Sequence, residues 1–257
     1  MKTLSLTRIV PTAFVAAASI LAATSADAAV ITWGSSTTII NDTTQIATAG
    51  FSVAGVDFSN AAGADVIINN GPGGAGGTNV TFRRLNGGGG LNGNSSVALT
   101  NGVTVTTTNW QFANSTGSMS NVTTTAPWGA ILDSNIGSFS TNGRITLSGL
   151  VAGTLYQVQY FASAEDGNSF NGTTVQGSPA FGNHTGGSGR FVLGTFTADG
   201  TSQVLDVIRG GDTFEEPVAS ALTIGAAAVV NVIPEPATAT LALLGLGGMM
   251  IRRRRMA

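Results

Sequence analysis

The chain lacks cysteine altogether and contains one histidine, His184. Without cysteine it forms no disulfide, and neither a thiol nucleophile nor a thiolate metal site is available. Zinc catalysis usually needs several His or Cys ligands, so the sequence excludes it as well. A Ser-His-Asp site needs a histidine as base and an acid that orients it. His184 is the one histidine, and its glycine-rich loop, GNHTGG, is a plausible place for neither group.

Charge is also scarce, at 9% of the residues, and lysine is missing after Lys2. Between Ala29 and Asn231 there are five arginines and eleven carboxylates, which gives a net charge of −6. Nucleic-acid binding normally requires clustered Lys and Arg to neutralise phosphates. We therefore expect no nucleic-acid partner.

What the chain does contain is glycine, with 36 residues, and many Thr, Asn and Ser residues, which suit short strands joined by tight turns. No stretch between the two ends shows sustained helical periodicity. An Asp199-Gly200 step between two alternating segments predicts a hairpin. Alternation of Tyr156, Val158 and Tyr160 with Leu155, Gln157, Gln159 and Phe161 predicts a strand with one wetter face. The predicted strands are 64–68, 79–83, 102–108, 143–147, 154–162, 189–197 and 203–209. The fold class is all-β, a β-sandwich that occupies residues 29–231 as one domain.

The N-terminal segment, residues 1–28, has the three parts of a secretory signal peptide. Lys2 and Arg8 give the basic start, an apolar stretch follows over Ile9–Ala23, and Ala26-Asp27-Ala28 is a small-x-small cleavage site. We expect export through Sec-type machinery and removal of this segment.

The C-terminal segment, residues 232–257, has an unusual order of parts. Pro234, Glu235 and Pro236 precede an apolar stretch, Ala237–Ile251, and four arginines follow, Arg252, Arg253, Arg254 and Arg255. As a helix the apolar stretch would be about 22 Å long, short against a hydrocarbon core of about 30 Å. The arginines favour a cytoplasmic C-terminus. We expect a short transmembrane helix that holds the domain outside the inner membrane transiently.

This tail resembles the PEP-CTERM sorting signal, which combines the same motif, a short glycine-bearing apolar helix and an arginine cluster. The resemblance implies recognition by an exosortase, a membrane enzyme that processes such tails, in bacteria that make exopolysaccharide. It implies a final location at the cell surface or outside the cell.

A second resemblance concerns the domain. The segments ITWGSSTTI, ITLSGLVAGTLYQVQYFAS and GRFVLGTFTADGTSQVLDV are similar to jelly-roll, galactose-binding-like domains often attached to PEP-CTERM tails. The resemblance implies that Leu147 and Leu150 pack inward and that Gly153 permits a turn. Tyr156 is then expected to hydrogen-bond back across the corner.

Tryptophans and loop carboxylates are the remaining candidates for a binding site. Trp33 is expected in the core, whereas Trp110 and Trp128, near loops, are candidates for stacking on sugar rings. Loop carboxylates offer oxygen ligands for a structural calcium ion, although neither run matches an EF-hand loop. The candidate ligands are Glu165, Asp166, Asp212 and Glu215. Solvated acidic turns are the alternative, and no other cofactor is expected.

Three functions follow in order of preference. The first is a non-catalytic cell-surface or extracellular-matrix protein associated with exopolysaccharide or biofilm. The alternative is a carbohydrate-binding module for the cell's own exopolysaccharide. A glycoside-acting enzyme comes third. Adjacent carboxylates on a strand point to opposite faces and cannot straddle one bond, whereas a cross-loop pair such as Glu165 with Glu216 is not constrained by the sequence.

Overall fold

The computed structural model describes ten stretches of the chain, 28–40, 42–59, 64–72, 76–85, 93–114, 127–138, 142–163, 172–181, 189–210 and 218–228. The expected signal peptide, apart from Ala28, and the expected sorting tail lie outside these residues. Within them, strands dominate and helix is confined to one short α-helix and one 3-10 turn, so the all-β prediction is confirmed. The jelly-roll topology stays a prediction.

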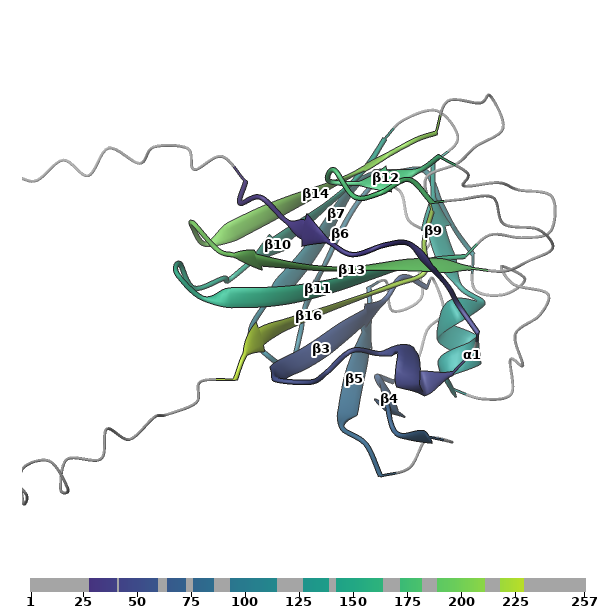
Figure 1. The fold of residues 1–257 in the computed structure, drawn as a ribbon. Helices are drawn as coiled ribbons and strands as arrows, with labels where there is room; N and C mark the ends of the chain where they lie inside the picture. Colours follow the sequence, from purple (N-terminus) through teal and green to yellow (C-terminus); the bar gives the residue numbers. More distant parts are fainter. Residues whose placement is uncertain are drawn as a thin grey trace, which may run out of the picture.

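The larger sheet contains eight strands (Figure 1). In spatial order the strands are β1 (Thr32–Trp33), β13 (Arg190–Thr197), β11 (Leu155–Ala162), β16 (Ala221–Ala227), β3 (Phe51–Asp57), β5 (Asn79–Arg84) and β4 (Val66–Asn69), with β2 (Thr37–Thr38) also paired to β13. Most neighbours are antiparallel, but β3 and β5 run parallel and place Asp57 beside Arg84.

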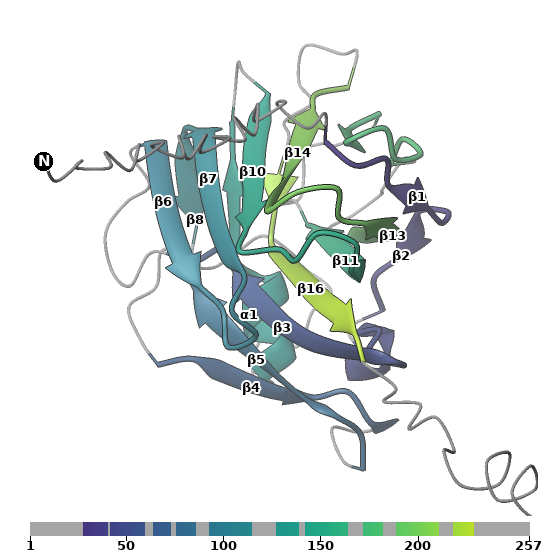
Figure 2. The ribbon, with the colours of Figure 1, turned by 90° about the vertical axis from the view of Figure 1, so that its left-hand side faces the viewer.

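The smaller elements complete the fold. A five-stranded sheet runs β12 (Thr174–Val175), β14 (Ser202–Ile208), β10 (Gly143–Ser148), β7 (Thr104–Trp110) and β6 (Gly93–Ala98). A three-stranded sheet runs β15 (Val218–Ala219), β9 (Asn135–Gly137) and β8 (Phe112–Asn114), and the helices are α1 (Pro127–Leu132) and the 3-10 turn η1 (Thr43–Gln45). Figure 2 shows the five-stranded sheet standing across from the eight-stranded one.

The main core lies between the two large sheets. Side chains alternate along each strand, so every second residue points inward. Val56 of β3, Val158 of β11 and Ile224 of β16 enter from the larger sheet, and Val105 of β7 and Leu205 of β14 enter from the smaller one. All five side chains are fully buried. Both hydrophobic clusters of the described chain fall within residues 29–224, so the segment from Ala29 to Asn231 has its own core.

Two of the connections between the large sheets lie side by side, and they correct the predicted hairpin at Asp199-Gly200. β13 pairs with β11 in the larger sheet, and β14 pairs with β10 in the smaller one. The link from β13 to β14 runs beside the link from β10 to β11, with Gly153 N donating to Ala198 O (2.7 Å) and Leu150 N donating to Thr201 O (3.1 Å). The Asp-Gly step therefore turns the chain between layers instead of joining neighbouring strands.

The predicted corner at Tyr156 is confirmed. The backbone N–H of Val151 donates to the Tyr156 hydroxyl at 3.0 Å. Leu147 and Leu150 are buried, and Gly153 has a φ of 80°, a left-handed conformation that favours glycine. The tyrosine thus fixes the crossing from β10 to β11.

The predicted wetter face of β11 is wrong beyond its first residue, Leu155. A second apolar cluster, which includes Phe161, Ile46 and Trp128, covers the outer side of the larger sheet. The buried amide of Gln159 accepts from Ala47 N (3.0 Å) and donates to Gln45 O (2.7 Å). Gln157 donates to Ala47 O (2.7 Å). The glutamines point outward as predicted, but they bind a covering segment of backbone rather than water.

Candidate functional site

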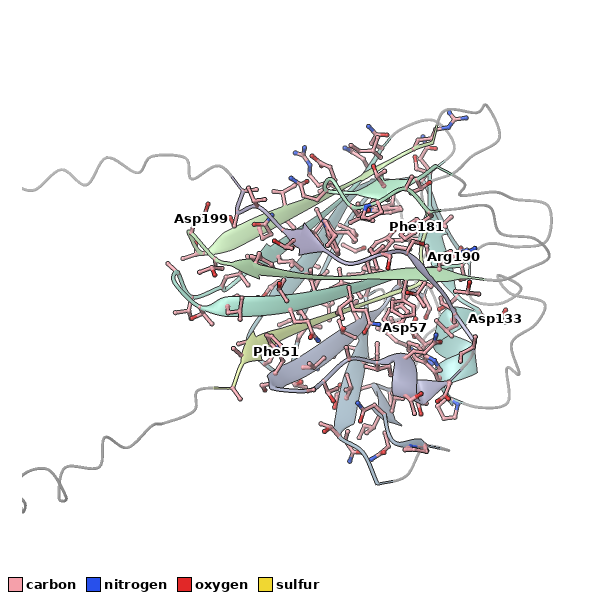
Figure 3. All side chains as sticks on the ribbon, in the orientation of Figure 1. Phe51, Asp57, Asp133, Phe181, Arg190 and Asp199 are labelled. Atoms are coloured by element: carbon pink, nitrogen blue, oxygen red, sulfur yellow. The ribbon has the colours of Figure 1, made fainter. Side chains whose placement is uncertain are left out.

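Asp57 is a buried carboxylate at the end of β3 (Figure 3). Its partners lie at the end of β5 and between α1 and β9. It is 2% exposed, and its Oδ1 accepts a hydrogen bond from Ser134 Oγ at 2.9 Å. Arg84 Nε lies 3.4 Å from Oδ2. Burial raises the pKa of Asp57 to about 6, and the hydrogen bonds from Ser134, Arg84 and Ser59 and the Arg84 charge offset only part of that effect. The carboxyl therefore takes up a proton as the pH falls through about 6.

The geometry around Ser134 can accommodate both protonation states of Asp57. Ser134 Oγ lies within hydrogen-bond distance of both Asp57 Oδ1 and the Ile131 carbonyl, at 2.9 and 2.8 Å. A hydroxyl has one proton to donate, so it cannot serve two acceptors at once. When Asp57 is neutral, its own O–H donates to Ser134, and Ser134 donates to Ile131.

Neighbouring hydroxyls bind backbone in the same manner. Ser163 Oγ hydrogen-bonds Ser220 Oγ and also donates to Leu132 O at 2.6 Å. Asn135 Nδ2 donates to Ser163 O at 3.1 Å. These residues are all buried, and they join the α1–β9 segment to the ends of β11 and β16. Solvent does not reach these side chains, and they hold the ends of the three elements together.

The structure corrects the expectation for Trp110 and Trp128. Trp110, at the end of β7, is 1% exposed, and its Nε1 donates to Arg144 O at 3.1 Å. Trp128, in α1, is 2% exposed and packs between Phe82 and Phe161, with ring centroids 5.5 and 5.2 Å away. Stacking on a pyranose needs an open ring face. Neither indole offers one, because core side chains cover both.

Trp33 is the tryptophan that keeps some exposure, although the sequence predicted it for the core. It packs against the main cluster from β1, over Gly194, and its Nε1 donates to Gln176 O at 3.1 Å. A side chain at position 194 would collide with the indole ring. The residue is therefore half-buried at a sheet edge.

The proposed calcium ligands and the single histidine lie outside the described residues. This applies to Glu165, Asp166, Asp212, Glu215 and His184. Among the residues that are described, no group of three or more His, Asp or Glu side chains is placed to hold a metal ion. The calcium hypothesis stays a prediction.

The outer face of the five-stranded sheet is rich in hydroxyl groups. Thr106 of β7 and Thr146 of β10 are register partners, and Ser96 of β6 pairs with Thr106 through a hydrogen bond of 2.9 Å. Arg144 and Asp206 form a bidentate ion pair, at 2.6 and 3.1 Å, in the same sheet. The face therefore offers hydrogen-bonding groups with locally balanced charge.

The residues described so far form an all-β protein. The sorting residues Pro234, Glu235, Pro236 and Arg252 to Arg255 lie beyond the last described residue, Ala228. Residues 232–255 match the family model described as the PEP-CTERM protein-sorting motif. This match confirms the resemblance of the tail. The motif marks an exported protein that is sorted at the membrane and processed by an exosortase.

Neither the curated proteins nor the solved structures contain a match to this chain. In the part of the chain that the structure describes, no helix has the length and apolar character to cross a membrane. The apolar segment Ala237–Ile251 lies outside that part. The sorting motif is therefore the one feature that places the protein in a functional class.

Proposed function

We propose that the protein is an exported, non-catalytic module of the cell surface or extracellular matrix, associated with exopolysaccharide. The sorting motif at residues 232–255 carries this proposal. The domain adds support, because the carboxylate with a raised pKa, Asp57, faces Ser134 and Arg84 inside the fold. Catalytic carboxylates with shifted pKa values normally line a cleft. In the proposed topology the signal peptide is removed and the domain lies outside, with the apolar tail held briefly in the inner membrane.

Loss of the motif is expected to abolish processing. In a bacterium that contains an exosortase, replacement of Pro234, Glu235 and Pro236 by Ala should leave the full-length chain in the membrane fraction. The unaltered chain should become a shorter, surface or extracellular form. Pulse-chase labelling followed by fractionation measures both. Asn231→Ala, just before the matched segment, serves as the control and should be processed normally. Equal processing of the triple variant would contradict the sorting role.

The hydroxyl face of the five-stranded sheet supports a second candidate, a carbohydrate-binding module. Hydroxyl rows can hydrogen-bond a polysaccharide without the aromatic stacking that burial of Trp110 and Trp128 rules out. Co-sedimentation of residues 29–231 with the host exopolymer, with and without calcium, tests it. We expect Thr106→Val together with Thr146→Val to weaken binding, since each side chain loses a hydroxyl at nearly constant shape. Thr195→Val, on the other sheet, is the matched control. Equal binding by the double variant and by this control would exclude the hydroxyl face as the site.

A further inference from the structure

Both ends of the domain leave the fold on the same side (Figure 1). The register shows this directly, because the end of β16 lies beside the start of β3 (Ala227 with Phe51), and the start of β11 lies beside the end of β13 (Leu155 with Thr197). β1 runs antiparallel to β13, with Thr32 opposite Thr195, so the chain before Thr32 leads to the same side. We call this side the terminal end. It consists of residues 28–31, 48–51, 149–155, 197–202 and 226–228.

The terminal end is apolar and almost uncharged. Asp199 is the one charged residue in its sequence segments. Val30, Val151 and Leu155 expose 88%, 62% and 43% of their surface there. Figure 3 shows Asp199 at this end, whereas Asp57, Asp133 and Arg190 lie toward the opposite one. The domain as a whole is acidic, but the segments around the exit of the tail contain a single carboxylate, Asp199.

The length of chain between the domain and the apolar tail restricts how the domain can sit. Eight residues separate Ala228 from Ala237. Fully extended, they reach about 26–29 Å. An eight-residue strand such as β13 is itself about 26 Å long. A domain that turned its far end to the membrane would need nearly the whole tether stretched along its side, whereas a domain that faces the membrane with its terminal end needs almost none.

We propose that, before the tail is processed, the terminal end rests on the lipid surface and inserts Val151 and Leu155 into the interfacial region. This inference rests on the proposed membrane-held sorting of the chain. A short tether keeps the domain at a high effective concentration near the bilayer, so a few apolar side chains are enough to hold an orientation. Bacterial membranes with anionic lipids repel carboxylates, and the terminal end has only Asp199 to be repelled. Cleavage of the tail removes the tether, and the contact is then too small to persist.

The absence of cysteine makes the test direct, because one introduced thiol is the only one in the chain. The full, unprocessed chain carrying Val151→Cys is labelled with an environment-sensitive fluorophore and reconstituted into phosphatidylethanolamine–phosphatidylglycerol vesicles that contain a nitroxide lipid quencher. Ile208→Cys is the control, because Ile208 is an exposed β-branched residue too, at 43% against 62% for Val151, but lies at the far end of β14. Melting curves of both labelled chains confirm that these exposed positions leave the fold intact.

We expect the probe at position 151 to lose most of its emission to the lipid quencher, and the probe at position 208 to keep it. High salt should not change this result, because the contact is apolar. Flotation in a density gradient shows whether the chain is bound to the vesicles. If it floats but the probe at position 151 is not quenched, the inference is overturned and membrane-held sorting is left intact. Shielding at position 151 that occurs only after addition of an exosortase would identify the enzyme as the occupant and also overturn it. Failure of the chain to float would overturn both proposals.

Discussion

Replacement of Trp110 by Ala is expected to lower the free energy of unfolding of residues 29–231 by about 3–5 kcal/mol. Trp110 is fully buried in the main cluster at the end of β7. Gly143 on the neighbouring strand lies against the indole ring and has no side chain that could fill the space left by truncation. The change also removes the donor to Arg144 O, which the indole reaches at 3.1 Å. Urea unfolding followed by circular dichroism measures the loss.

Trp33→Ala is the control for this prediction, because the same residue type is truncated where it is half-buried. A smaller loss is expected there, since less apolar surface leaves water on folding. Iodide quenching adds an independent check, because Trp33 is the only tryptophan of the three with appreciable exposure in the structure. An equal loss in both variants, or ready quenching of Trp110 in the native protein, would contradict the burial of Trp110.

The corner at Tyr156 illustrates how much of the fold could be predicted. Its signals are local, namely a strand that ends at two inward leucines, a glycine in the turn and a tyrosine shortly after. The hydrogen bond from Val151 N to the tyrosine hydroxyl spans five residues. Seven strands were predictable for the same reason, since alternation is read within each strand, but β3, β6 and β16 were not among them.

The layer of each strand was not predictable. The Asp199-Gly200 step has the sequence of a hairpin turn. However, β13 pairs with β11 in one sheet, and β14 pairs with β10 in the other. Gln157 and Gln159 likewise read as a wet face, but segments more than a hundred residues earlier in the chain cover them. Both errors come from partners distant in sequence, whose pairing no local pattern records.

Asp57 shows the same limit for the candidate site. Its position after an apolar alternating segment could suggest an inward carboxylate, but Ser134 is 77 residues away. Arg84 is adjacent only through the parallel pairing of β3 and β5. The sorting tail, by contrast, is a linear motif, so its recognition required no structure.

The buried carboxyl of Asp57 is expected to make the domain less stable as the pH rises. Its pKa is about 6 in the folded protein against 3.8 for an ordinary Asp, so the native state binds more protons than the unfolded state between these values. The free energy of unfolding therefore decreases from about pH 4 to about pH 6 and levels off above, by about 3 kcal/mol in total at about 1.4 kcal/mol per pKa unit. The positive charge of Arg84 stabilises the ionised carboxylate and so limits this decrease.

Asp57→Asn should remove most of this pH dependence. The amide keeps the shape of the neutral acid, and its N–H can donate to Ser134 while Ser134 donates to Ile131, so the hydrogen bonds of the protonated carboxyl survive. Urea midpoints at about pH 4.5 and about pH 8 should then differ far less than in the unaltered protein. Asp65→Asn is the control, because that carboxylate pairs with Arg83 at the surface and is 41% exposed. An unchanged pH slope in the Asp57 variant, or its loss in the Asp65 variant, would show that the titrating group lies elsewhere. The expected result means that the carboxyl in the interior is neutral only below about pH 6, and that Arg84 limits the cost once it ionises.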